Sequence, residues 1–243
     1  MATGETAVVT GASAGIGAAI ARVLLEQGHD VVTLQRRPPS YTHPRLSFRA
    51  VDLADRAAAR QVAAEVARAH PVRYLVNNAG VNRPGRIEQV TDEDLDQVFS
   101  INLAAAIVLA QAFLPGMRAA RYGRILNIAS RAMLGKVGRA AYATTKAGLV
   151  GLTNSLAVEA GADGVTVNAI APGPVASELF DNGHPPGSAQ RQRVIDGILV
   201  GRVGTPEDIA NAAGFLLDRR SGYVTGQLLY VCGGTSVTGT GGQ

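Results

Sequence analysis

The feature that most constrains the fold is a regular alternation between short apolar runs and longer alanine-rich segments. The short runs are rich in β-branched residues, as strands are, and most of the segments between them are long enough to form helices. Because these runs are almost continuously apolar, both faces of the sheet must be covered. We therefore expect an α/β fold, with a doubly wound, mostly parallel sheet and helices on both faces. Seven strands are predicted, at Thr6–Val9, Val31–Leu34, Leu46–Val51, Tyr74–Val76, Arg124–Ile128, Val165–Ile170 and Gln227–Val231.

A single domain spanning residues 1–243 is expected, since a chain of this length can bury one sizeable core. The sequence contains no internal repeat and no segment with the composition of a linker. Two stretches read as loops, Arg36–Pro44 and Asn182–Ser188. Ligands of doubly wound sheets bind outside the carboxyl ends of the strands, so functional residues are expected just after each strand.

Charge and hydropathy argue against nucleic acid and membrane as partners. The formal net charge is +4, but the arginines that supply it are scattered, without a basic block or interleaved aromatic residues. Val98–Met117 is uncharged and long enough to span a bilayer. Asn102, Gln111 and Pro115 interrupt it and alanine dominates it, which favours a helix buried in a core or in a subunit interface.

Cys232 is the single cysteine of the chain. An internal disulfide is therefore excluded, and no cysteine spacing suits a structural metal. The first eleven residues lack the basic leader and long apolar run of a signal peptide. We expect a protein of the cytoplasm that binds no metal.

A glycine-rich turn follows the first predicted strand, and a helix is expected from about Ala18 to Gln27. Gly11 allows a tight turn, Gly15 lets the backbone approach a pyrophosphate, and Gly17 permits close packing of helix on strand. The free amides of the helix N-terminus would bind the phosphates. A turn that only links two elements is the alternative, but the strand before it and the helix after it favour a dinucleotide site. The predicted contacts in this turn are Gly11, Ser13, Ala14, Gly15, Ile16 and Gly17.

The spacing Gly-x3-Gly-x-Gly resembles the opening of the short-chain dehydrogenase/reductase family rather than the more widespread G-x-G-x-x-G. The resemblance covers nearly the whole chain and implies a Rossmann-like seven-stranded sheet in one NAD(P)-binding domain. It also implies hydride transfer between a nicotinamide cofactor and a carbonyl or secondary alcohol. Ser177 departs from the family, which more often has threonine touching the nicotinamide amide. The segments that carry the resemblance, in family order, are Asn77-Asn78-Ala79-Gly80, Asn102, Ser130, Tyr142-x3-Lys146, Pro172-Gly173 and Arg202-x-Gly204-x-Pro206-Glu207-Asp208.

Tyr142 and Lys146 are four residues apart on a predicted helix, so their side chains share one face, one turn apart. A free tyrosine titrates near pH ~10, and a neighbouring positive charge favours its phenolate. We therefore expect Tyr142 to act as the acid/base, with Lys146 and an oxidised nicotinamide together lowering its pKa. Ser130 would hydrogen-bond the reacting oxygen, although alone it reads as an ordinary serine at a strand end. By the resemblance, Asn102 would hold a water that links Lys146 to solvent.

The end of the second strand bears on the choice of cofactor. NAD-selective enzymes place an acidic residue there, whereas an arginine nearby accommodates the 2′-phosphate of NADP. Gln35 is not acidic and Arg36 follows it, which favours NADP. The alternative is that Arg36 and Arg37 are only solvated loop residues. Position 14 also argues against NADP, because alanine stands there in place of the basic residue that many NADP users have in the glycine turn. Further predicted cofactor contacts are Leu53, Asn78, Ala79, Gly80, Tyr142, Lys146, Pro172, Gly173, Val175 and Ser177.

Asp52 follows the third predicted strand and has two possible roles. By the family resemblance it contacts the adenine of the cofactor. It could equally cap a helix that begins at about Ala54.

The substrate is expected to contact a loop at about residues 175–200. His184 in this loop could touch substrate, although the polar, proline-rich surroundings favour plain exposure. Arg131, Lys136, Arg139 and Arg83 cluster in sequence near the catalytic residues and suggest a negatively charged or hydroxylated substrate. Solvated loop charges are the alternative.

The sequence also bears on two alternative functions and on the oligomeric state. A 3-oxoacyl-acyl-carrier-protein reductase would need a basic docking surface, for which Arg118, Arg121 and Arg124 are available, although Asp163 interrupts it. A non-catalytic sensor or scaffold would not need Ser130, Tyr142 and Lys146 intact. The apolar segments at about 95–117 and 143–160 predict a homotetramer.

Overall fold

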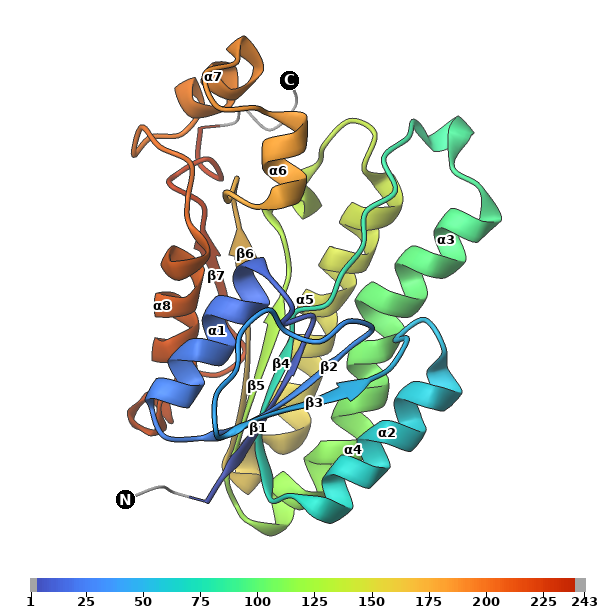
Figure 1. Cartoon of the computed structure of the whole chain (residues 1–243), viewed down its shortest axis with the longest axis vertical. Coiled ribbons are helices and arrows are strands. Elements are labelled where there is room, and N and C mark those ends of the chain that lie inside the picture. The colour runs from blue at the N-terminus through green and yellow to red at the C-terminus, as the bar shows by residue number, and fades with distance from the viewer. Residues whose placement is uncertain (1–3, 239–243) are drawn as a thin grey trace.

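The computed structural model describes residues 4–238, so the first three and last five residues of the predicted domain lie outside the described residues. Its seven strands form one sheet in the order β3-β2-β1-β4-β5-β6-β7, and every neighbouring pair is parallel (Figure 1). The doubly wound parallel sheet is confirmed, and all seven predicted strands are present. The strands are β1 Thr6–Thr10, β2 Asp30–Gln35, β3 Leu46–Ala50, β4 Val72–Asn77, β5 Gly123–Ile128, β6 Val165–Pro172 and β7 Leu228–Val231.

Helices cover both faces of the sheet, as predicted. One apolar core joins the sheet to α2, α4 and α5, and a second joins it to α1 and α8. Adjacent residues of β1 illustrate the arrangement, because Val8 belongs to the first core and Val9 to the second. A strand buried on both faces has to be continuously apolar, which is why its sequence does not alternate. The helices are α1 Gly15–Glu26, α2 Arg56–Ala69, α3 Asp92–Phe99, α4 Ala105–Ala119, α5 Ala140–Ala160, α6 Glu178–Gly183, α7 Ala189–Asp196 and α8 Pro206–Leu217.

The helix after the glycine turn begins at Gly15 rather than at about Ala18, which corrects the predicted start. Its first intrahelical hydrogen bond runs from the Ala18 amide to the Ala14 carbonyl, at 3.4 Å. The residues between these two therefore already belong to the helix. No helix joins β2 to β3, and the predicted loop at Arg36–Pro44 is found there.

The uncharged segment lies in one continuous helix from Asp92 to Ala119, made of α3, a π-helical turn at Ser100–Ala104, and α4. By length and composition this helix could cross a membrane, and it is the one such helix among residues 4–238. Half of its most apolar window is buried. Leu109, Phe113 and Met117 pack into the core of the sheet, as expected for the core helix of an α/β domain.

The segments after β6 lie beyond the carboxyl ends of the strands. Figure 1 shows α6 and α7 at the top of the molecule, above the ends of β6 and β7. The predicted substrate loop at 175–200 thus contains two short helices rather than an irregular loop.

Candidate functional site

The glycine turn between β1 and α1 is shaped by close backbone contacts. Gly11 has a positive φ of 67°, and a Cβ there would lie 2.9 Å from the Cα of Ala79. A Cβ on Gly17 would lie 2.4 Å from both the Gly11 carbonyl oxygen and the side-chain Nδ2 of Asn78. At Gly15, by contrast, a Cβ would meet nothing within 4 Å. Side chains are thus excluded where the turn packs on the loop after β4.

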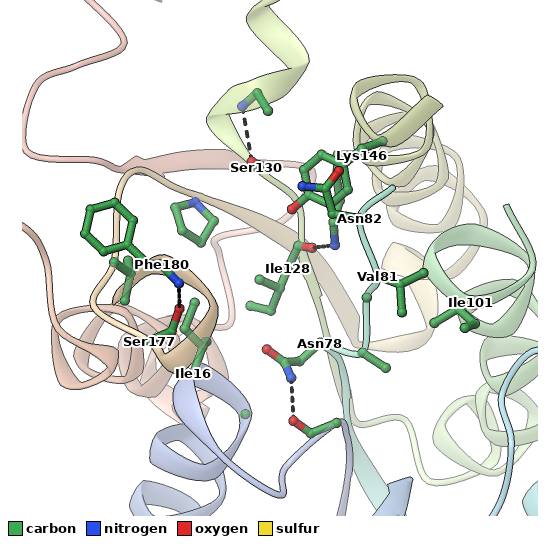
Figure 2. Close-up of a pocket in the computed structure, with 18 of the residues that line it drawn as sticks. Ile16, Asn78, Val81, Asn82, Ile101, Ile128, Ser130, Lys146, Ser177 and Phe180 are labelled. Atoms are coloured by element: carbon green, nitrogen blue, oxygen red, sulfur yellow. Dashed lines mark hydrogen bonds between the residues drawn. The ribbon is translucent and has the colours of Figure 1, made fainter. Parts of the chain in front are cut away.

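Asn78 fastens the loop after β4 to this turn. Its Nδ2 donates to the carbonyl oxygens of Thr10 and Gly11, at 2.9 and 3.0 Å, as Figure 2 shows for one of these bonds. In return, the Thr10 hydroxyl accepts from the backbone amides of Asn78 and Ala79, both at 2.9 Å. Asn78 therefore shapes the glycine turn and lines the same cleft.

Gln35, at the end of β2, is buried rather than directed to solvent. Its Oε1 accepts from the Ala12 amide at 2.6 Å, which fixes the glycine turn to β2. Its Nε2 is buried without a hydrogen-bond partner in the protein. Arg36 and Arg37 are exposed, line the cleft, and form no ion pair with any described residue.

The cap of α2 is Asp55, not Asp52, which corrects one of the two roles considered for Asp52. The Asp55 carboxylate accepts from the amides of Ala57 and Ala58, and the helix starts at Arg56. Asp52 instead accepts from the Ala54 amide at 2.9 Å and lines the cleft beside Leu53. The contact of Asp52 with adenine stays a prediction.

Asn102 lies in the π-helical turn between α3 and α4 and is 2% exposed. Single π turns inside α-helices are frequent at functional sites. The Asn102 carboxamide bonds the Val81 backbone in both directions, accepting from the amide at 2.8 Å and donating to the carbonyl at 2.9 Å. It also donates to the Thr145 hydroxyl at 3.1 Å. Asn102 therefore ties the loop after β4 to α5, and its part in a water chain stays a prediction.

Ser130, Tyr142 and Lys146 meet at the carboxyl end of β5. Ser130 follows that strand, and its hydroxyl accepts from the Ala132 amide at 3.1 Å. Tyr142 and Lys146 lie on the first two turns of α5, with the ammonium nitrogen 5.7 Å from the centre of the phenol ring. The Lys146 ammonium donates to the Ile128 carbonyl at 2.6 Å (Figure 2). The predicted catalytic group is thus assembled from two elements.

In the protein without a cofactor, burial dominates the electrostatics of this group, and the lowering of the Tyr142 pKa by Lys146 together with a nicotinamide stays a prediction. Burial raises the pKa of Tyr142, while the Ser130 hydroxyl and the Arg139 charge act to lower it without overcoming burial. Lys146 is not among the groups that lower the pKa of Tyr142. Burial also lowers the pKa of Lys146, to about 8, because the residue is only 3% exposed. In the protein alone, Tyr142 is therefore a neutral phenol at pH ~7.

One cleft of about 920 Å³ contains the glycine turn and the catalytic group. All predicted site residues line it except Gly15, which starts α1, and Asn102, which is buried behind the loop after β4. Most of the lining residues lie at or just after the carboxyl ends of β1 to β6, as expected for this topology. Lining residues that were not predicted as contacts are Arg37, Val51, Val81, Asn82, Ile101, Ile128, Ala129, Ala132, Pro174 and Val194.

The segment after β6 closes one side of the cleft. Val175 pairs with Gly204, and the Ser177 hydroxyl caps α6 by accepting from the Phe180 amide at 3.2 Å (Figure 2). His184 is stacked on the Phe180 ring, with centroids 4.5 Å apart, and both rings line the cleft. His184 is half-buried, so plain exposure, the favoured interpretation, is wrong.

The residues at the glycine turn fit the diphosphate of a dinucleotide. Ala14 at the N-cap of α1 has no side chain to cap the helix, so the first amides remain available to an anion. The Cβ positions at Gly11 and Gly17 are closed by the protein itself, whereas the one at Gly15 is open. The fold and this cleft together define an α/β nucleotide-binding protein of the Rossmann type.

Comparison with known proteins identifies the family. Residues 11–236 match the family model described as enoyl-(acyl carrier protein) reductase. A 3-oxoacyl-[acyl-carrier-protein] reductase of Rickettsia bellii (strain RML369-C) is 39% identical over 241 residues, which covers 96% of this chain and 97% of the relative. The chain belongs to the short-chain dehydrogenase/reductase family, and it is an NAD(P)-dependent oxidoreductase that acts on CH–OH and C=O groups.

Two solved structures share this fold over almost their whole length. One, described as an NAD(P)-dependent gluconate 5-dehydrogenase from Beutenbergia cavernae with bound NADP, is 37% identical with a TM-score of 0.88. The other, described as a 2-deoxy-D-gluconate 3-dehydrogenase from Agrobacterium tumefaciens with bound NADP, is 36% identical, also with a TM-score of 0.88. In both cases 96% of each chain is covered.

Proposed function

We propose that the protein transfers a hydride between NADP(H) and a small carbonyl or secondary alcohol, with Tyr142 as the acid/base. The observation that carries the proposal is the convergence of Ser130, Tyr142 and Lys146 in the same cleft as the glycine turn. The nicotinamide, when bound, supplies or accepts the hydride. The chain's own groups manage the proton and the charge on the reacting oxygen.

Each catalytic side chain has a distinct part in the reaction. The neutral phenol of Tyr142 donates its proton to the carbonyl oxygen during reduction and takes it back in the reverse direction. The Ser130 hydroxyl hydrogen-bonds the same oxygen as negative charge develops there. Lys146, held by the Ile128 carbonyl, places a positive charge near the phenol and replenishes its proton. Asn102 positions this machinery by holding Val81 and Thr145.

The end of β2 supports NADP over NAD. No carboxylate follows this strand, and Gln35 is engaged with the Ala12 amide. Arg36 and Arg37 are exposed at the cleft without an ion-pair partner among the described residues, so a phosphate there would meet two available guanidinium groups. Both solved relatives contain NADP, which points the same way.

Replacement of Arg36 by alanine is expected to raise KM for NADPH by about 10-fold or more, and KM for NADH by much less, because one charge-assisted hydrogen bond to the 2′-phosphate is lost. Steady-state kinetics with both cofactors would measure the effect. Arg49→Ala removes an exposed arginine that does not line the cleft and serves as the matched control. Equal losses with the two cofactors would show that Arg36 is only solvated.

Reduction of 3-oxoacyl groups on an acyl carrier protein is a second candidate, since curated relatives carry that activity in their names. The basic surface considered for docking does not support it. Arg124 is 3% exposed and donates to the carbonyls of Gly123 and Arg219. Arg118 and Arg121 are paired with Asp163. The three arginines lie near the start of β5, whereas Ser130 follows the opposite end of that strand, so they do not surround the entrance to the catalytic group.

A sensor or scaffold without turnover is the rival from another class. The decisive experiment is an assay of NADPH oxidation and NADP⁺ reduction over a broad panel of carbonyls and alcohols, including a 3-oxoacyl thioester, with the NADH and NAD⁺ assays in parallel. Turnover of any panel member supports an enzyme. Tight binding of NADPH without turnover of any member would favour a sensor.

We also infer a homotetramer and a cytoplasmic location, the latter from the single, buried and free Cys232. Two separate parts of the surface expose apolar side chains. One lies on the long helix and α5, with Phe99, Ile107 and Val158 exposed to 37%, 38% and 86%. The other lies on α8 and the edge strand β7, with Phe215 and Leu229 exposed to 56% and 38%. Two distinct isologous contacts build a dimer of dimers.

Light scattering at micromolar concentration should therefore give the mass of four chains. Val158→Asp, which places a charge in one of the two contacts, is expected to yield dimers. A monomeric mass for the wild-type chain would contradict the proposal.

A further inference from the structure

The end of the cleft that holds the catalytic group has an uneven charge distribution. Among the described residues that line the cleft there is one carboxylate, Asp52, and it lies after β3 at the adenosine end. The opposite end, near Tyr142, is lined by Arg83, Arg131, Lys136 and Arg139, none of which has a carboxylate neighbour in the lining. Any group that enters this end from solvent meets a positive potential.

Two of these four cations have protein partners and two do not. Arg83 donates to Gln97 at 2.6 Å and lies 3.8 Å from Asp94, so its charge is engaged outside the cleft. Arg131 makes a long contact of 3.4 Å with the Thr235 carbonyl. Lys136 and Arg139 form no ion pair with any described residue. They are the two charges available to a ligand.

The available cations lie close enough to influence one another and the reaction centre. Arg139 acts to lower the pKa of Tyr142, which places its charge within electrostatic range of the phenol. Burial, together with the charges of Arg139 and Arg131, lowers the pKa of Lys136. Like charges held together without a counter-ion raise the free energy of the protein, and a bound anion would remove that cost.

Asn82 contributes a second, uncharged feature at the same end. Its side chain lines the cleft, and its Oδ1 is buried without a hydrogen-bond partner among residues 4–238. Figure 2 shows Asn82 at the end of the cleft that holds Ser130 and Lys146. A buried polar atom without a partner is costly, and a hydroxyl satisfies a carboxamide in either orientation because it can both donate and accept.

We propose that the substrate is a hydroxylated anion, whose carboxylate or phosphate is bound by Lys136 and Arg139 and one of whose hydroxyls is bound by Asn82. The proposal rests on the proposed function of the cleft and specifies its substrate class. The anion contributes recognition remote from the reacting carbon, and the Asn82 contact selects a substrate with a hydroxyl near that carbon.

The test is a panel that varies charge and hydroxylation independently. With NADP⁺, the alcohols form three pairs of an anion and a neutral compound: D-gluconate and D-glucitol, 3-hydroxybutyrate and 2-butanol, and glycerol 3-phosphate and glycerol. The first two anions are carboxylates and the third is a phosphate, so comparison of the pairs distinguishes the two kinds of anion. We expect one of the hydroxylated anions to have the highest kcat/KM. Binding of the same compounds to the NADP⁺ complex, measured by calorimetry, gives a readout that does not depend on turnover.

The variants assign each feature to its residues. Lys136→Gln is expected to lower kcat/KM and affinity for the anions by about 10-fold, with little change for neutral compounds. Adding Arg139→Gln is expected to lower the affinity for the anions by up to about 100-fold and to leave the affinity for neutral compounds unchanged. Turnover is compared only with the single variant, because the Arg139 charge acts on Tyr142. Asn82→Ala is expected to lower kcat/KM for the hydroxylated compounds by about 10-fold and to leave 3-hydroxybutyrate unchanged. Arg193→Gln removes an exposed arginine that does not line the cleft and should change nothing. An unchanged Kd for NADPH confirms that each variant is folded.

Two results would overturn the inference. The first is equal affinity and equal turnover for charged and neutral members of each pair. The second is a loss of binding affinity in the double variant that is the same for anions and neutral compounds. In either case turnover of the neutral alcohols would leave the proposed oxidoreductase function standing, whereas the absence of turnover and of binding for every compound would count against both.

Discussion

Tyr142→Phe is expected to reduce kcat by roughly 10²–10⁴-fold or more, while the affinity for NADPH stays close to that of the wild-type protein. The substitution removes the one group that can donate a proton to the carbonyl oxygen and leaves the ring and its packing in place. The phenol is a neutral donor at neutral pH because burial keeps the pKa of Tyr142 raised. Turnover and fluorescence titration of NADPH measure the two effects separately.

Tyr223→Phe is the matched control, because it removes the same hydroxyl from a fully exposed side chain that does not line the cleft. Ser130→Ala should give a smaller loss than Tyr142→Phe, since Ser130 supplies a hydrogen bond and no proton. If Tyr142→Phe kept more than about a tenth of the wild-type kcat, the general-acid role of 10²–10⁴-fold could not belong to Tyr142.

The sheet could be predicted from the sequence because burial on both faces demands continuous apolar strands. That demand left apolar runs at buried strands such as β1 and β2, whereas β3 and β7, at the two edges of the sheet, are partly exposed. The ends of all seven strands were placed within two residues. The shape of the glycine turn, and the meeting of Ser130, Tyr142 and Lys146 in one cleft, were predictable for a similar reason. Each depends on a residue type that cannot be replaced, such as glycine where Gly11 meets Ala79 at 2.9 Å.

Other features depend on contacts between distant segments, which local sequence patterns do not predict. Asp52 and Asp55 are both acceptable helix caps, and only the direction of the chain after β3 selects Asp55. Arg124 reads as a surface cation but is buried against backbone carbonyls that lie more than ninety residues away in the sequence. The place of Asn82 in the cleft could have been predicted, because Asn82 follows the Asn-Asn-Ala-Gly segment at the carboxyl end of β4.

The environment of Lys146 was the least predictable part of the site. Sequence spacing placed its ammonium near Tyr142, and the structure agrees at 5.7 Å from the ring centre. The spacing could not reveal that the ammonium also donates to the Ile128 carbonyl in a nearly dry environment. Burial is the dominant effect on both groups, raising the pKa of Tyr142 and lowering the pKa of Lys146. Each shift favours the neutral form of the side chain. The lysine therefore carries a cost to stability that accompanies its function.

Lys146→Met is expected to expose that cost. Its folded-state pKa of about 8 lies below the ordinary lysine value of 10.5. Between these pH values the unfolded chain binds a proton that the folded protein does not, so the free energy of unfolding of the wild-type protein rises with pH. The rise totals about 3 kcal/mol from this group. The methionine variant lacks the titrating group and should lack this rise, while its kcat falls by roughly 10²–10⁴-fold.

Chemical denaturation of both proteins from pH 7.5 to 10.5, at one protein concentration, measures the difference. Lys136 and Cys232 also have lowered pKa values, but both proteins retain them, so their contributions cancel when the two curves are subtracted. Subtraction also removes the effect of oligomer dissociation where it is common to the two proteins. We expect the wild-type curve to be the steeper one between pH 8 and 10.5. Parallel curves would mean that Lys146 is as well solvated in the folded protein as in the unfolded chain. The conclusion that burial lowers the pKa of the Lys146 ammonium beside Tyr142 would then be wrong.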